Sequence, residues 1–227
     1  MTKNVVEKID DLVKINTMLV SVSDKSGLET LIPGMIALNP EIVILSTGGT
    51  FGRIKEILGD RASHHLRQVS EYTGQPETQG GLVKTLDFKI YLGLLTETYN
   101  AAHQKDLERT GARSIDMVVV NLYPFSETIA RVGATLENAR GNIDIGGPTM
   151  IRAAAKNFIR VAPVVEPSAY ADILKKLGEG QGALALADRF ALACRAFAHT
   201  AAYDTAIAGY LSGLSGTELQ SSYTPGE

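Results

Sequence analysis

The sequence has no tryptophan, a single cysteine and no long apolar run. One cysteine excludes a disulfide framework within the chain. Cys194 lies in an alanine-rich helical stretch, where a buried and inert thiol is favoured over a nucleophile. No apolar run approaches the roughly 18 residues of a membrane span, and the polar N-terminus does not resemble a secretion signal. These absences predict a soluble, cytoplasmic protein that does not bind a membrane.

The sequence also has little net charge and no pattern of metal-binding residues. The formal net charge is −3, so no global basic field suggests nucleic acid as a partner. The four histidines show no metal-ligand spacing, and we expect no metal site. Hydrophobic residues make up 44% of the 227 residues, which is enough for a sizeable core. Since neither a repeat nor a linker divides the chain, we expect an N-terminal arm over 1–16, one domain over 17–212 and a flexible tail over 213–227.

Short apolar runs alternate with helical patterns along the chain. Strands are predicted over residues 18–22, 42–45, 66–69, 117–120 and 161–165. Helices are predicted over 25–38, 51–58, 101–110, 148–157, 167–177 and 183–210, with a kink or break at Pro33. Residues 1–16 read as a loose arm or short helix. Strands that alternate with helices indicate an α/β fold with a mainly parallel sheet flanked by helices. Ligands of such folds bind beyond the carboxyl ends of the strands.

The most informative stretch runs from Asn142 to Asn157. It places Asp144, two glycines, Pro148 and Lys156 around a predicted helix start. The glycines free the backbone to approach an anion, and proline suits a first helical turn because its missing N–H would be unpaired there. Lys156 is expected about two turns along the helix, at roughly 1.5 Å per residue. Asp144 and Lys156 are therefore predicted to face one small ligand near the helix start.

Two more loops fall at the same predicted edge of the sheet. The first, Thr47-Gly48-Gly49-Thr50, lies between a strand and a helix, where free N–H groups and the helix dipole suit a phosphate. The alternative there is an ordinary tight turn. The second, Ser21-Val22-Ser23-Asp24-Lys25, offers hydroxyls and a cation, and its alternative is a helix N-cap with an exposed lysine. Together the two loops favour an anion site.

Lys84 and Thr85 follow a second glycine pair, and Val120, Asn121 and Tyr123 end a buried strand. Taken singly, the lysine reads as a solvated side chain at a strand start, and the tyrosine as a core residue before a turn. The placement of both groups at the sheet edge favours one pocket shared with the other loops.

Seven motifs, in consistent order from about Met18 to Leu211, resemble the IMP cyclohydrolase domain, the N-terminal half of the bifunctional purine biosynthesis protein that also carries AICAR formyltransferase. They are SVSDKSG (21–27), TGGT (47–50), VKTL (83–86), VVVNLYPF (118–125), NIDIGGP (142–148), RAAAKN (152–157) and AFAHTAAYD (196–204). The resemblance implies a methylglyoxal-synthase-like α/β fold and a homodimer. It also implies closure of 5-formamidoimidazole-4-carboxamide ribotide (FAICAR) to IMP with loss of water, without metal or cofactor.

The resemblance also implies roles for individual residues. Lys156 matches the proton donor or acceptor, Lys84 matches a second catalytic lysine that would stabilise the oxyanion, and Tyr123 and Asp144 match the remaining catalytic side chains. The division of labour among the four stays open. The implied nucleotide-binding residues are Ser23, Asp24, Lys25, Thr47, Gly48, Gly49, Thr50, Thr85, Val120, Asn121 and Ile145.

One departure lies in the second glycine segment, where the resemblance implies arginine but the chain has Leu82, and implies His-Pro but the chain has Asp87-Phe88. The retained catalytic side chains favour activity. A nucleotide-binding or regulatory module with lost or weak turnover is the alternative. A methylglyoxal-synthase-type lyase is a further one, which leaves the NLYPF and DIGGP segments without a role. No formyltransferase segment follows Leu211, so formyl transfer is expected on a separate chain.

We predict that Leu82→Arg tightens binding of IMP. Leucine cannot donate the charge-assisted hydrogen bonds of an arginine, each worth roughly 1.5–3 kcal/mol, so one such bond would lower the dissociation constant by about tenfold or more. Isothermal titration calorimetry measures the change, with Leu82→Met as the uncharged control. An unchanged dissociation constant in Leu82→Arg would show that another cation, such as Lys89 or Arg53, already fills that place.

Overall fold

The computed structural model describes residues 5–76, 83, 85–224 and 226. Its centre is a five-stranded sheet of order β4-β3-β2-β5-β6, in which every neighbouring pair is parallel. The strands are β2 (Thr17–Val22), β3 (Val43–Ser46), β4 (Leu66–Gln68), β5 (Met117–Asn121) and β6 (Ala162–Val164). The predicted α/β fold with a parallel central sheet is confirmed, and each predicted strand forms within a residue or two of its expected bounds.

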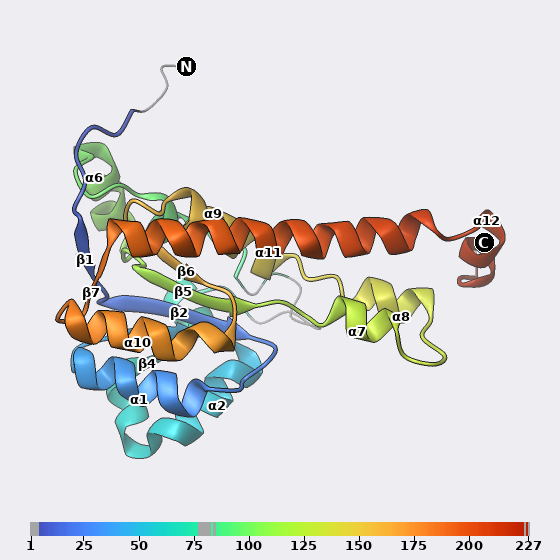
Figure 1. The fold of residues 1–227 in the computed structure, drawn as a ribbon, viewed down its shortest axis with the longest axis horizontal. Helices are drawn as coiled ribbons and strands as arrows, with labels where there is room; N and C mark the ends of the chain where they lie inside the picture. The colour runs from blue at the N-terminus through green and yellow to red at the C-terminus, as the bar shows by residue number, and fades with distance from the viewer. Residues whose placement is uncertain (1–4, 77–82, 84, 225, 227) are drawn as a thin grey trace.

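Helices cover both faces of this sheet (Figure 1). Successive residues of a strand point to opposite faces, so Met18 and Val20 pack in one core cluster and Leu19 packs in the other. The first face is covered by α1 (Leu28–Leu38), α2 (Gly48–Leu58) and α10 (Tyr170–Glu179). The second is covered by α5 (Phe88–Leu95), α9 (Gly146–Lys156) and α11 (Leu186–Ser212). Burial on both faces explains why the strands read as continuous apolar runs.

Shorter elements complete the described chain. They are α3 (Ala62–His65), α4 (Val69–Thr73), α6 (Ala101–Thr110), α7 (Phe125–Ile129), α8 (Leu136–Gly141) and α12 (Gly216–Ser221), with 3-10 turns at Gly59–Arg61 and Pro167–Ala169. A separate antiparallel pair joins β1 (Leu12–Lys14) to β7 (Ala183–Ala185).

The N-terminal segment differs from the expected loose arm or short helix, because part of it forms strand β1. Arg189 of α11 is fully buried and donates to the backbone carbonyls of Asp10, at 2.9 Å, and Asp11, at 2.8 Å. The same guanidinium binds the carbonyls of Phe158 and Ile159, each at 3.0 Å. A buried arginine needs such partners, so it holds the arm against the domain from nearly 180 residues away in sequence.

Two local expectations, a break at Pro33 and a buried Cys194, were also wrong. Helix α1 runs unbroken through Pro33, whose missing N–H costs one bond to the carbonyl of Glu29, an exposed residue that water can reach. Cys194 is exposed on α11, not buried. The tail contains helix α12, which begins with a capping box between Ser215 and Glu218, and its flexibility stays a prediction.

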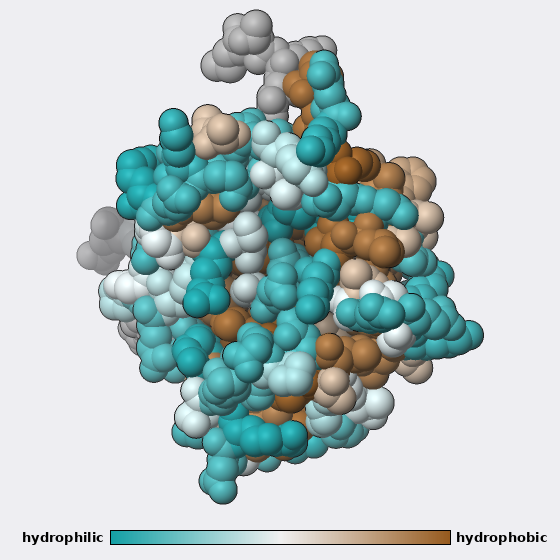
Figure 2. All heavy atoms as spheres, turned by 90° about the vertical axis from the view of Figure 1, so that its left-hand side faces the viewer, coloured by the Kyte–Doolittle hydropathy of each residue, from teal (hydrophilic) through white to brown (hydrophobic). Residues whose placement is uncertain are grey.

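Helix α11 is the longest described helix, with 27 residues, and it runs along the body and beyond it (Figure 1). Among the described residues, no helix is both long and apolar enough to cross a membrane. The end of the molecule near β1 and β7, where the sheet strands begin, is mostly hydrophilic with scattered apolar patches (Figure 2).

Strand register sets the opposite edge, where the strands end. Val22 pairs with Asn121, and Val20 pairs with Ser46. The loops that follow β2, β3 and β5 therefore start at nearly the same height and lie next to one another. This is the edge at which the sequence predicted a shared pocket.

Candidate active site

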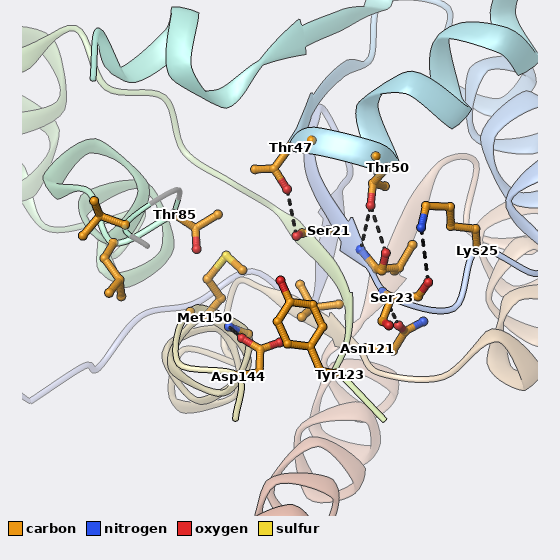
Figure 3. Close-up of a pocket in the computed structure, with 18 residues that line it drawn as sticks. Ser21, Ser23, Lys25, Thr47, Thr50, Thr85, Asn121, Tyr123, Asp144 and Met150 are labelled. Carbon is orange, nitrogen blue, oxygen red and sulfur yellow. Dashed lines mark hydrogen bonds between the residues drawn. The ribbon is translucent and has the colours of Figure 1, made fainter. Parts of the chain in front are cut away.

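A cavity of about 240 Å³ lies at the carboxyl edge of the sheet. Loops after β2, β3 and β5 form its walls together with the start of α9 and the segment before α5 (Figure 3). Most of the predicted site residues line it, namely Ser23, Lys25, Thr47, Gly48, Gly49, Thr50, Thr85, Val120, Asn121, Tyr123 and Asp144. The predicted convergence of separate loops on one pocket is therefore what the fold produces.

Other predicted site residues are not among the described lining of the cavity. Lys84 lies outside the described residues, as does Leu82. Asp24 is not among the lining residues, and its carboxylate accepts a hydrogen bond from the backbone N–H of Ser26 at 2.9 Å, which lowers its pKa. Ile145, just before α9, is 60% exposed and also lies outside the cavity wall. The roles of Lys84, Asp24 and Ile145 stay predictions.

Lys156 corrects a specific expectation. It is the last residue of α9 and is exposed, whereas Asp144 precedes the first turn of that helix. Lys156 comes twelve positions after Asp144 in sequence, which corresponds to roughly 18 Å of helix. The prediction that Asp144 and Lys156 of one chain face the same ligand is therefore wrong. The expected place of Lys156, about two turns along the helix, is close to what forms. The error lies in the inference that two turns still allow both side chains to face one ligand.

One half of the cavity is built to hold an anion. Helix α2 begins at Gly48, which has a φ of 46° and needs the freedom of glycine. The first N–H groups of a helix have no partner within it, so those of Gly48 and Gly49 are available to a ligand. Lys25 lies beside them, since a Cβ on Gly49 would be 3.9 Å from its Nζ. A cation next to a helix N-terminus suits a phosphate group.

Hydroxyl and amide side chains hold these loops in place. Asn121 Oδ1 accepts from the N–H groups of Ser23, at 2.7 Å, and Asp24, at 2.9 Å, while its Nδ2 donates to the carbonyl of Asp24 at 2.8 Å. Thr50 Oγ1 accepts from the N–H of Val22 at 3.1 Å and donates to its carbonyl at 3.0 Å. These contacts shape the pocket wall, and contact of Asn121 and Thr50 with a ligand stays a prediction.

The other half carries acid–base groups. The ring of Tyr123 stands beside Asp144, and its hydroxyl points into the cavity (Figure 3). Asp144 accepts a hydrogen bond from the N–H of Gly147 at 2.8 Å. Burial raises the pKa of the Asp144 carboxyl above its ordinary value. Burial, and then the negative charge of Asp144, raise the pKa of the Tyr123 phenol. Within the described ranges, no cluster of three or more His, Cys, Asp or Glu side chains could hold a metal ion.

The cavity is also lined by Ser21, Gly146 and Gly147, which belong to segments that the sequence singled out, and by Met150, which the sequence did not single out. A Cβ on Gly146 would lie 2.6 Å from Thr85 Oγ1, and one on Gly147 would lie 2.6 Å from Asp144 Oδ2. Both glycines are therefore required for close packing at the site. Met150 comes two residues after the NIDIGGP motif, which was the signal that could have found it.

Comparisons with known proteins agree with this architecture. The family model described as MGS-like domain matches residues 31–149, and that of the AICARFT/IMPCHase bienzyme matches residues 154–225. The bifunctional purine biosynthesis protein PurH of Acidithiobacillus ferrooxidans is 45% identical over 201 residues, which is 88% of this chain and 37% of the relative. PurH of Desulfitobacterium hafniense is 48% identical over 204 residues, 90% of this chain and 38% of the relative.

A solved structure is similar over nearly its whole length. The crystal structure of ForH superimposes with a TM-score of 0.68 at 32% identity, and covers 85% of this chain and 96% of the ForH chain. By contrast, this chain spans less than two fifths of the two PurH relatives.

We predict that Gly147→Ala destabilises the protein, whereas Gly52→Ala stabilises it. The new Cβ at position 147 would press on Asp144 and on Leu122 Cδ2, also 2.6 Å away, at a cost of about 1–3 kcal/mol. Gly52 is an exposed glycine within α2 with nothing within 4 Å of its Cβ position, so alanine there gains about 0.4–1 kcal/mol. Urea unfolding measures both changes. Equal stabilisation by the two variants would contradict the close packing of Asp144 on Gly147.

Proposed function

We propose that this chain, which belongs to the AICARFT/IMPCHase family of purine biosynthesis enzymes and contains their MGS-like domain, is an IMP cyclohydrolase that closes FAICAR to IMP with loss of water. One observation carries the proposal. Tyr123 and Asp144 share a cavity with the anion-binding start of α2. A nucleotide needs both features, because its phosphate must be anchored while its base is exposed to acid–base groups.

The nucleotide is oriented by these two halves. Its phosphate is bound by the N–H groups of Gly48 and Gly49 and by the charge of Lys25, because that end of the cavity carries the free donors. The imidazole ring with its carboxamide and formamido groups then extends toward Tyr123 and Asp144. Anchoring the phosphate away from the reacting atoms leaves the ring to be positioned by the walls of the pocket.

The reaction joins two groups of one molecule. The carboxamide nitrogen attacks the formyl carbon, so that a C–N bond forms while the carbonyl π electrons move onto the formyl oxygen. The attacking nitrogen gives up one proton and the formamido nitrogen gives up another. The formyl oxygen takes up both protons, its C–O bond breaks and it leaves as water, while a C=N bond forms to the formamido nitrogen. Since the reacting atoms are already tethered, the enzyme must select the reactive rotamer, assist the proton transfers and stabilise the charge on the oxygen.

Asp144 is suited to accept a proton in this reaction, and Tyr123 is suited to donate one. The raised pKa of the Asp144 carboxyl makes it a stronger base than an exposed aspartate, and we assign to it the proton of the attacking nitrogen. The raised pKa of the Tyr123 phenol keeps its proton available for donation to the formyl oxygen. Lys84 precedes the pocket residue Thr85, and we assign to its ammonium group the stabilisation of the same oxygen.

Lys156 enters the proposal through a homodimer. It is exposed at the end of α9, and the neighbouring surface of α11 carries the half-exposed rings of Phe190 and Phe197. Arg152 lies one turn before Lys156, and its guanidinium stands 5.6 Å from the centre of the Phe197 ring. Exposed aromatic side chains beside arginine are typical of protein interfaces. We propose that this surface binds a second copy, so that Lys156 of one copy completes the pocket of the other.

The cyclohydrolase is tested by incubating the protein with FAICAR and following IMP formation by ultraviolet absorbance. We expect turnover in the wild type and a loss of about 100-fold or more in Asp144→Asn, as for removal of a general base. Asp106→Asn makes the same chemical change in an exposed ion pair on α6 and should keep full activity. If the wild type binds IMP but does not turn over FAICAR, the cyclohydrolase proposal is refuted and a nucleotide-binding module is favoured.

Shared sites are tested by combining two inactive variants. Lys156→Ala is expected to lose turnover while keeping its folding stability, because the side chain is exposed. Co-expression with Asp144→Asn would form mixed dimers in which one of two sites has both residues. Activity should then recover to about a quarter of the wild-type value in a symmetric dimer. If activity does not recover, Lys156 does not contribute to the neighbouring site. If Lys156→Ala loses folding stability as much as turnover, Lys156 is a structural residue.

A further inference from the structure

Tyr203 of α11 reaches the loop that carries Asp144. Its hydroxyl accepts a hydrogen bond from the backbone N–H of Asp144 at 2.8 Å and donates one to the carbonyl of Asn142 at 3.0 Å. We propose that Tyr203 is a positioning residue, which fixes the loop before α9 so that the Asp144 carboxylate faces the cavity. The inference deepens the proposed function, since it concerns the group to which we assign proton abstraction.

The ring of Tyr203 also touches the second catalytic segment. It packs edge to face against Phe125, with ring centres 6.2 Å apart and planes at 71°. Phe125 is buried, begins α7 and donates its N–H to the carbonyl of Tyr123 at 2.8 Å. One side chain of α11 therefore braces both segments that bring Tyr123 and Asp144 into the cavity. This double contact distinguishes Tyr203 from a residue that only fills space.

A phenol is suited to this task because one hydroxyl can donate and accept at the same time. Phenylalanine would keep the packing on Phe125 but would leave the N–H of Asp144 and the carbonyl of Asn142 without their partner. Among the described residues, Asp144 would then be held only through its carboxylate, by the backbone N–H groups of Gly147 and Tyr123. The loop would gain freedom, and the carboxylate would be reached more easily by water.

Burial, with the charges around it, keeps the hydroxyl of Tyr203 protonated. Burial raises its pKa most, the N–H of Asp144 lowers it, and Asp144, Asp204 and Tyr123 raise it further. The phenol therefore retains the proton that it donates to Asn142 across the neutral range. Tyr123 is the titratable group that faces Asp144 from the β5 side of the cavity.

Tyr210 provides a matched control on the same helix. Its ring also packs on Phe125, at 5.9 Å between centres and 83° between planes. Within the described part of the chain, its hydroxyl makes no hydrogen bond to a loop of the cavity. Tyr203→Phe and Tyr210→Phe therefore remove the same atom from two rings that pack on the same residue, and only the first should affect Asp144.

The test follows the Asp144 carboxyl by carbon-13 NMR over a pH titration of the intact protein, without substrate. In the wild type its pKa should lie above the ordinary value of about 3.9, because burial raises it. Tyr203→Phe should shift it back toward that value, and Tyr210→Phe should leave it unchanged. With FAICAR, Tyr203→Phe should lower kcat about tenfold with KM nearly constant. The acid limb of its pH profile should move to lower pH.

An unchanged Asp144 titration in Tyr203→Phe, or an equal shift in Tyr210→Phe, would overturn the proposal. If Tyr203→Phe fails to fold, the proposal is tested by amide hydrogen exchange of the wild type. Protection of the Asp144 amide would support its hydrogen bond to Tyr203, and fast exchange would refute it. The titration does not depend on turnover. A wild type that forms no IMP but shows the expected shift would refute the cyclohydrolase and leave the positioning role intact.

Discussion

The parallel pairing of β2 with β3 and β5 is the constraint on which the site depends. Its register ends all three strands at one edge, so that loops separated by about 100 residues in sequence become neighbours. The amide of Asn121 then joins the loop after β5 to the loop after β2, and Thr50 joins α2 to the end of β2. A one-residue slip would turn the alternating core residues to the wrong face, and it would also separate these side chains.

Within this sheet architecture, the Asp144 carboxylate is buried at a place where its negative charge costs stability but can serve the proposed reaction. It lies at the start of α9, where unpaired N–H groups favour negative charge, and the glycines after it let the helix approach. Burial opposes the charge and raises the pKa of the carboxyl. The balance gives a base that is stronger than a surface aspartate yet is held by Gly147 and, through its backbone, by Tyr203. The same features that cost stability thus supply the proposed chemistry.

The sequence predicted what depends on local pattern. The five strands, α6 and the turn at Thr47–Thr50 follow from apolar periodicity and glycine placement, and most proposed ligand residues meet in one cavity. The errors have distant causes. The segment that contains strand β1 is held by the distant Arg189, and Tyr203 contacts a loop about 60 residues away in sequence. Lys156 was misplaced because residues of neighbouring motifs were assumed to be close in space. Leu82 remains the one departure in the resemblance that lies within a binding segment.

The central claim is that one cavity binds the nucleotide with its phosphate at α2 and its base at Tyr123 and Asp144. A crystal structure of the protein with IMP bound tests it most directly. The account predicts phosphate oxygens within hydrogen-bond distance of the N–H groups of Gly48 and Gly49 and of Lys25 Nζ, with the purine ring next to the Tyr123 hydroxyl and the Asp144 carboxylate. IMP bound elsewhere, or bound with its base at α2 and its phosphate at Asp144, would contradict it.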